Sequence, residues 1–148
     1  MSYNPKLTPL TITVGPAASY HEPNQWDPDL EEGNSRDLRI KMVKDIKNQA
    51  SKILPRVLTA LEIVPKHKFM DVDKTPGSSH SEKIKMIYTS YNYHHGVGNT
   101  TVEPTKKIGL KLSMLKIDVG MDVLIHGGNG YNESLVSQLV GPQGKVTV

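Results

Sequence analysis

A cluster of glycines near the C-terminus, Gly127-Gly-Asn-Gly130, constrains the fold more than any other feature of this sequence. The apolar run 123–126 precedes it, the amphipathic stretch 131–140 follows it, and a β-branched run at 145–148 begins after a Pro/Gly turn. This order predicts a βαβ unit with a glycine-rich loop at its crossover. Glycine lets the backbone approach a ligand, and the next helix offers unpaired N–H groups, as in sites for nucleotide-like cofactors. A tight strand-to-helix turn without a ligand is the alternative interpretation.

The composition is lean in apolar residues for a compact domain. The chain has 148 residues, enough for one domain with a real core, but only 36% are apolar, with one Phe and one Trp. Part of the chain is therefore expected to be extended, or to complete its core against another polypeptide. Residues 1–35 are rich in Pro, Asn, Ser and Gly and predict an irregular N-terminal arm, with one edge strand at 10–14.

Charge and cysteine content exclude several classes of function. Residues 1–35 carry one lysine against five acidic residues, and the remainder carries seventeen basic against ten acidic residues. The basic residues are interleaved with acids, which does not favour nucleic-acid binding. The sequence has no cysteine, hence no disulfide, thiolate nucleophile or thiolate metal site. No stretch approaches the roughly 18 apolar residues of a membrane helix. We expect a cytoplasmic protein without a membrane segment or a metal.

Helical spacing dominates the middle of the chain. Ser35 is expected to cap a helix over 36–50, and Pro55 to begin a second helix that Pro65 closes. Alternation over 84–90 predicts a short strand. Pro104 begins a third helix with three apolar residues on one face: Ile108, Leu112 and Leu115. A turn at 118–121 then leads into the strand 123–126.

Three blocks of the sequence and one short segment upstream of them, in the same order, resemble the protein-L-isoaspartate O-methyltransferase family. The glycine block resembles the family's first cofactor motif, with Arg39-Ile-Lys-Met-Val resembling its opening helix. The segment Val64-Pro-Lys-His-Lys-Phe69 resembles the end of its second helix, Val-Pro-Arg/Lys-His-x-Phe. Gly96-Val-Gly-Asn-Thr-Thr-Val-Glu-Pro104 resembles its substrate loop, Gly-x-Gly-x-Thr-x-Ser-x-Pro.

This resemblance implies an α/β fold: a partial Rossmann-like methyltransferase fold with N-terminal helices and an incomplete parallel sheet over 36–148. It implies transfer of a methyl group from S-adenosylmethionine to a protein or peptide carboxylate, as in isomerised aspartate. Cofactor contacts would come from Gly127, Gly128, Gly130 and Tyr131, which opens the following helix. Gly98, Thr100 and Thr101 would line the substrate side.

The chain departs from the family pattern at three places. The glycine loop is one residue short, and Leu124-Ile-His126 stands where Leu-Glu-Ile is expected, so an acidic contact to the cofactor is lost. Val102 occupies the position of the family's active-site serine, and valine has no hydroxyl to bond a carboxylate. The acidic residue that grips the ribose in the family should follow the second strand, but the sequence ends at Val148.

Several other polar residues have less specific interpretations. His94 and His95 are adjacent, so in a strand they would point to opposite faces and not share an ion; a surface loop is the simpler expectation. His126 would contact a cofactor, relay a proton or be a strand-end histidine bonded to backbone. His67 is expected to be structural.

Two functions therefore remain open. One is a methyltransferase that uses S-adenosylmethionine on a protein or peptide carboxylate. The other is a non-catalytic, truncated homologue that serves as a structural or regulatory subunit and completes its sheet against a protein partner. The second predicts an open strand edge at 145–148, which would be a liability in a free monomer.

Overall fold

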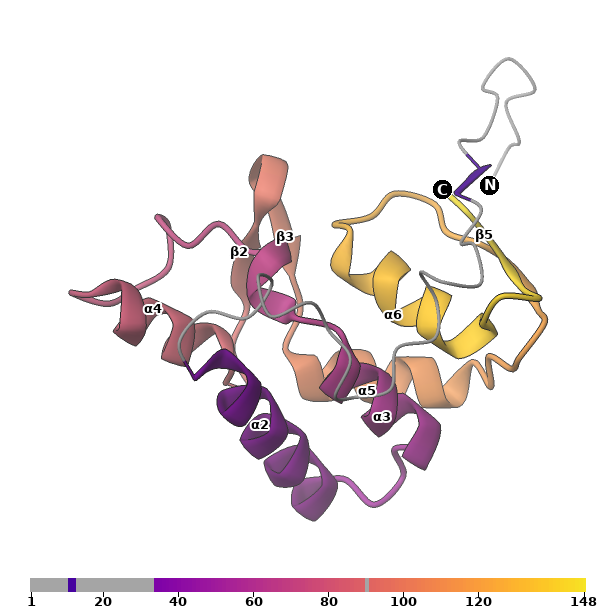
Figure 1. Cartoon of the computed structure of the whole chain (residues 1–148), viewed down its shortest axis with the longest axis horizontal. Helices are drawn as coiled ribbons and strands as arrows, with labels where there is room; N and C mark the ends of the chain where they lie inside the picture. The colour runs from indigo at the N-terminus through magenta and orange to yellow at the C-terminus, as the bar shows by residue number, and fades with distance from the viewer. Residues whose placement is uncertain (1–10, 13–33, 90) are drawn as a thin grey trace.

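The computed structural model describes residues 11–12, 34–89 and 91–148 (Figure 1). Most of the N-terminal arm predicted over 1–35 lies outside these residues. Helices and short strands follow in the order β1 (Thr11–Ile12), α2 (Ser35–Gln49), α3 (Pro55–Ile63), η2 (Lys66–Phe69), α4 (His80–Ile87), β2 (His94–Gly96), η3 (Val97–Asn99), β3 (Thr100–Val102), α5 (Thr105–Met114), β4 (Asp122–Leu124), α6 (Tyr131–Val140) and β5 (Lys145–Thr147).

The predicted βαβ unit is present at the C-terminus. Strands β4 and β5 are parallel and pair Val123 with Val146, while α6 makes the crossover between them. Leu135, Val136 and Leu139 of α6 are buried, as expected for a crossover helix that covers one face of a parallel sheet. Together with the helices before it, this unit forms a partial Rossmann-like α/β fold.

The open edge of the sheet differs from the prediction. The strand order is β1-β5-β4, with β1 antiparallel to β5 and Ile12 paired with Val146. Strand β5 therefore has a neighbour on both sides, and the prediction of an open edge at 145–148 is wrong. Within the described residues the two edge strands of this sheet are β1 and β4, and β4 is the edge of its parallel pair. Thr11 and Ile12 of β1 pair with Thr147 and Val146 of β5 on this edge.

The helices pack around one apolar core. Met42 and Ile46 of α2, Leu61 of α3 and Ile108 of α5 are buried in the same cluster as the apolar face of α6. Pro55 begins α3, as predicted, because proline at the first helical position loses no hydrogen bond. Helix α5 packs closely at Gly109, where a Cβ would lie 3.5 Å from Cδ1 of Leu61 on α3 and 3.0 Å from Cδ1 of Ile53 just before α3.

Arg56 connects three parts of this core. Its guanidinium donates to the carbonyl oxygen of Ile117 and to that of Leu139, each at 2.8 Å, and to the carboxylate of Asp118 at 2.8 Å. One side chain on α3 thereby satisfies backbone acceptors near the ends of α5 and α6. It also fixes the turn at 118–121, where Met121 N–H donates to Asp118 O as predicted.

Three local predictions need correction. The N-cap of α2 is Asn34 instead of Ser35, which is buried in the first turn. Leu115 follows the last residue of α5 and is 68% exposed, so it does not share the buried face of Ile108 and Leu112. The strand predicted over 84–90 is wrong, because these residues belong largely to α4.

The start of α4 explains why helix prevails there. Ser79 is its N-cap, and the Ser79 hydroxyl accepts from the N–H of Glu82 at 3.2 Å. Glu82 in turn accepts from the N–H of Ser78 at 2.8 Å. These bonds satisfy donors that a helix leaves unpaired at its start, in the manner of a capping box. Ile84 and Ile87, three residues apart, are then buried on one face.

Candidate functional site

The glycine loop lies at the carboxyl end of β4, one of two parallel strands, as the sequence predicts. Gly127 and Gly130 have φ of +69° and +82°, in the left-handed region that favours glycine. Gly130 is the N-cap of α6, so the loop leads directly into the unpaired N–H groups of a ten-residue helix. A Cβ at Gly127 would meet nothing within 4 Å, which leaves the backbone there open to a ligand.

Glu133 folds back into this loop from the first turn of α6. A Cβ at Gly128 would overlap Oε1 of Glu133, so the loop admits this side chain only because residue 128 is glycine. The Glu133 side chain is buried, and its Oε2 has no hydrogen-bond partner within the described part of the chain. Oδ1 of Asn132 is also buried and also has no hydrogen-bond partner within the described part of the chain. Sequence reasoning missed Glu133, although its place three residues after the N-cap is the spacing of a capping box.

Tyr131 opens α6, as expected, but its side chain faces the core. It is fully buried, and its ring packs against that of Phe69 with centroids 5.9 Å apart. Burial raises the pKa of its phenol above the ordinary value. Any contact of Tyr131 with a cofactor would therefore come from its backbone, while the ring holds the loop against Phe69.

The predicted substrate loop is a hairpin of β2 and β3. His94 pairs with Val102 and Gly96 with Thr100, and Gly98 makes the bend with a φ of +73°. Thr100 donates its hydroxyl to the carbonyl oxygen of Val97 at 2.9 Å. Thr101 is exposed, whereas Val102 is fully buried. Val102 thus packs in the core, and Thr101 carries the accessible hydroxyl of β3.

The residues 66–70 join the hairpin to the glycine loop. A Cβ at Gly130 would lie 3.0 Å from Cδ1 of Phe69, so the ring of Phe69 lies against the loop. The next residue, Met70, forms a bridge with Gly96 of β2, and Asp71 N–H donates to His95 O at 2.7 Å. The three sequence blocks that share the family resemblance are therefore in contact in the folded chain.

A buried polar cluster lies beneath this junction. Nζ of Lys66 donates to Oγ1 of Thr105 at 2.7 Å, and both side chains are buried. Burial lowers the pKa of Lys66 to about 7, and burial together with Lys66 lowers the pKa of His94 to about 4. Nδ1 of His67 lies 2.6 Å from the hydroxyl of Tyr88, which places His67 in the core, as predicted. Burial of Lys66 has no signal in the sequence, because lysine is ordinarily exposed.

The histidine pair occupies opposite faces of β2, as its spacing predicts. His94 is buried and His95 is exposed. The expectation of a surface loop is wrong here, because backbone pairing with β3 places these residues in a strand. His126 is exposed beyond the end of β4.

A groove of about 330 Å³ runs beside the glycine loop along the open edge of β4. His126 and Asn132, on either side of the loop, line one part of it, and the apolar side chains of α5, β4 and α6 line the rest. Glu103 lies between this groove and the hairpin, and accepts from Nζ of Lys111 at 2.6 and 2.8 Å. This hydrogen bond lowers the pKa of Glu103. The groove thus borders the glycine loop at His126 and Asn132 and the end of the hairpin at Glu103.

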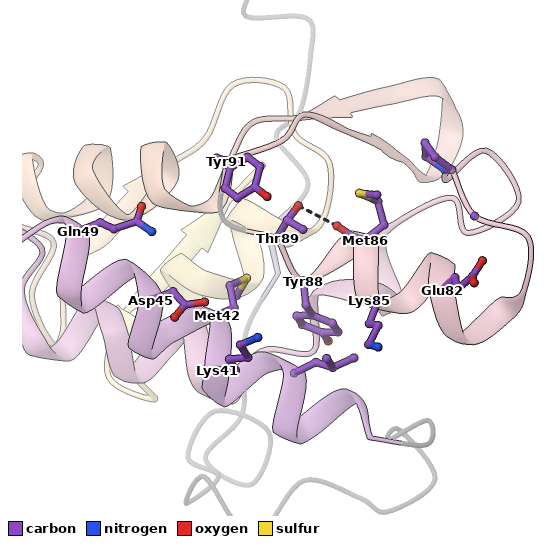
Figure 2. A pocket seen from close by; sticks show the side chains of 13 residues that line it. Lys41, Met42, Asp45, Gln49, Glu82, Lys85, Met86, Tyr88, Thr89 and Tyr91 are labelled. Atoms are coloured by element: carbon purple, nitrogen blue, oxygen red, sulfur yellow. Dashed lines mark hydrogen bonds between the residues drawn. The ribbon is translucent and has the colours of Figure 1, made fainter.

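A second groove, of about 580 Å³, lies between α2 and α4 (Figure 2). Met42 and Tyr88 provide apolar surface, while Lys41 and Asp45 place opposite charges on the same wall. None of the residues predicted to bind cofactor or substrate lines it. Its mixed charges indicate no particular ligand, so the site is best placed at the glycine loop.

Two structural features bear on metal binding and membrane association. No group of three or more His, Asp or Glu side chains suited to a metal ion occurs within residues 34–89 and 91–148. Among the helices that the structure describes, none combines the length and apolar character of a bilayer-crossing segment.

Comparison with known proteins agrees with the geometry. The sequence profile of the family described as protein-L-isoaspartate(D-aspartate) O-methyltransferase (PCMT) matches residues 37–148. The chain belongs to this family. A protein-L-isoaspartate O-methyltransferase of Methanococcus maripaludis (strain C5) is 34% identical over 93 residues, covering 62% of this chain and 39% of the relative. One from Aeropyrum pernix is 29% identical over 141 residues, or 95% of this chain and 49% of the relative.

A solved structure supports the fold. A protein-L-isoaspartate O-methyltransferase matches with a TM-score of 0.55 and 25% identity, over 73% of this chain and 32% of that chain. The chain thus spans between one third and one half of the length of these relatives. It has the part of the methyltransferase fold that includes the glycine loop and the hairpin.

Proposed function

We propose that this chain binds S-adenosylmethionine at its glycine loop and positions a protein or peptide carboxylate for methylation, as in isoaspartate methyl transfer. The contact between the three family blocks carries this proposal, because Phe69 and Met70 hold the glycine loop and the hairpin together. A location in the cytoplasm stays a prediction.

The residues around the loop fit such a cofactor. The backbone at Gly127, Gly128 and Gly130 is free of Cβ atoms, and Glu133 and Asn132 have buried acceptor atoms without protein partners in the described chain. These acceptors match a ligand that has ammonium and hydroxyl donors. The cofactor supplies a methyl group on a sulfonium, which is electrophilic without help from a metal or a base.

On the substrate side, this chain must hold and desolvate a carboxylate within reach of the methyl group. Gly98 provides the sharp bend, and Thr101 provides an exposed hydroxyl that donates a hydrogen bond. Thr100 supports the bend through its bond to Val97 O. Because Val102 is buried and has no hydroxyl, Thr101 takes the role of carboxylate donor in this proposal.

Two measurements test this function. Isothermal titration calorimetry with S-adenosylmethionine, and with its demethylated product, should give a saturable signal. No heat at millimolar ligand would contradict the proposal. Transfer of labelled methyl to an isoaspartyl peptide should exceed transfer to the aspartyl isomer, and Thr101→Val should lower transfer without lowering cofactor affinity.

A second function, as a non-catalytic subunit, is favoured by the open edge of β4. Leu124 on this strand is 66% exposed, and exposed Met121 and Leu115 lie on either side of the turn that leads to it. A parallel strand from a protein partner would cover this apolar edge and its unpaired backbone groups. Light scattering after size exclusion tests this second function. If the chain binds the cofactor and stays a monomer at all concentrations, the enzyme function is favoured instead.

A further inference from the structure

The carboxylate of Glu133 lies inside the glycine loop, next to Gly128 at the start of α6. Backbone N–H groups at a helix N-terminus attract anions such as phosphate. Here the carboxylate of Glu133, in the first turn of α6, already lies against Gly128. A phosphate at the loop would meet this fixed negative charge.

The same carboxylate is incompletely satisfied by the protein. Glu133 is 7% exposed, and its Oε2 has no hydrogen-bond partner in residues 34–89 and 91–148. A buried acceptor without a donor destabilises the folded protein, and more so when it is charged. A ligand that brings a donor or a positive charge would relieve this destabilisation.

No neighbouring residue of the described chain donates a hydrogen bond to Oε2 of Glu133. Asn132, the next side chain along α6, presents a buried amide oxygen that is also without a partner, and Asn129 uses its amide oxygen to accept from Asn132 N–H at 3.1 Å. The loop therefore contains two buried acceptors, Oε2 of Glu133 and Oδ1 of Asn132, to which no donor of the described chain bonds.

We propose that Glu133 is the cofactor-contacting acid of this loop and makes the loop select a cationic, hydroxyl-bearing nucleoside over a nucleoside phosphate. This rests on the proposed function, since S-adenosylmethionine is such a cation. Glu133 thereby replaces, from the helix side, the acidic contact that the strand end Leu124-Ile125-His126 lacks. Gly128 is required for it, because any side chain at 128 would displace the carboxylate.

The test uses the full chain and three probes in calorimetry: S-adenosylmethionine, S-adenosylhomocysteine and ATP. Wild type should bind the first two and not ATP. Glu133→Gln, which keeps the shape and removes the charge, should weaken S-adenosylmethionine binding at least tenfold and reduce the discrimination against ATP. Glu62→Gln, the same charge change on α3, should leave both unchanged.

Thermal unfolding without ligand separates this role from a structural one. Glu133→Gln should unfold at the wild-type temperature or above, because it removes a buried charge without a partner. If Glu133 served only to stabilise the start of α6, Glu133→Gln would instead have a lower unfolding temperature than wild type and an unchanged affinity for S-adenosylmethionine. That outcome would overturn the inference.

Gly128→Ala provides an independent variant. The added methyl should expel the Glu133 carboxylate and weaken S-adenosylmethionine binding, and the double variant Gly128→Ala/Glu133→Gln should lose little more than either single variant. Independent, additive losses would contradict the inference. If wild type binds neither S-adenosyl ligand, both the proposed function and this role of Glu133 are overturned. If wild type binds and Glu133→Gln binds equally well, this role alone is overturned.

Discussion

Gly130 and Gly120 have the same φ, +82°, but different surroundings. A Cβ at Gly130 would lie 3.0 Å from Phe69, whereas a Cβ at Gly120 would meet nothing within 4 Å. Alanine at either position should cost about 1–2 kcal/mol of unfolding free energy from backbone strain. Gly130→Ala should cost roughly a further 1 kcal/mol through crowding against Phe69. Urea unfolding of the two variants measures the difference, and equal losses would show that the Phe69 contact is not tight.

Lys66 should make stability depend on pH. Its pKa is lowered to about 7 by burial, while the unfolded chain titrates near the ordinary value of 10.5. The folded state favours the neutral amine, so this stabilisation is complete above pH 10.5 and is lost progressively as pH falls toward 7. Within that window the slope approaches about 1.4 kcal/mol per pH unit.

Lys66→Met isolates this effect. Its unfolding free energy should vary less with pH between 7 and 10 than that of wild type, and the wild-type curve should fall relative to that of the variant as pH is lowered. Chemical denaturation at four pH values provides the measurement. Parallel curves would mean that Lys66 remains charged in the folded protein.

At the scale of elements, Arg56 determines how α3 meets the C-terminal unit. Because its guanidinium bonds the carbonyl oxygens of Ile117 and Leu139, Arg56→Ala should lose about 2–4 kcal/mol of unfolding free energy. Arg56→Lys should lose less, since an ammonium can still reach one acceptor. Lys52→Ala, at an exposed position, is the matched control and should change stability by less than about 0.5 kcal/mol. A loss for Arg56→Ala no larger than that of the control would exclude this role.

The predictions from the sequence and the structure differ mainly in the short helices and strands. The residues 84–90 alternate like a strand, but Ser79 and Glu82 supply a helix start just upstream, and burial of Ile84 and Ile87 then fits helical spacing. The signal was present in the Ser-x-x-Glu spacing. The hairpin of β2 and β3 had less local evidence, because pairing between three-residue strands depends on contacts with the rest of the chain.

At the scale of the whole molecule, the open edge of β4 should lead to weak association. An exposed apolar edge strand is a template for pairing with another chain, and a lysine there opposes it. Wild type should therefore show a mass that rises with concentration in light scattering, and Leu124→Lys should reduce this rise. The substitution should leave the unfolding temperature nearly unchanged, because Leu124 is exposed. Ile40→Lys, on α2, is the control; equal reduction by both would contradict a specific role of the edge.

The position of the candidate site followed from the sequence, but its lining did not. A glycine run between a strand and a helix places Gly127, Gly128 and Gly130 at the carboxyl end of β4 by the geometry of a βαβ unit alone. That Glu133 lies inside the loop, that Tyr131 faces Phe69, and that Thr101 rather than Val102 is exposed depend on which side chains fill the remaining space. Such packing involves residues far apart in the chain.

Resemblance of its sequence blocks indicated the family. The sequence by itself also determined the order of the C-terminal βαβ unit and the position of its glycine loop, because periodicity and glycine spacing act over a few residues. Only the tertiary structure decided that β1 covers β5 and leaves β4 open, and that Lys66 is buried beside His94. Which strands become neighbours and which side chains are buried depends on segments far apart in the chain that compete to pack on the same surface. A local sequence pattern cannot predict which segment packs there.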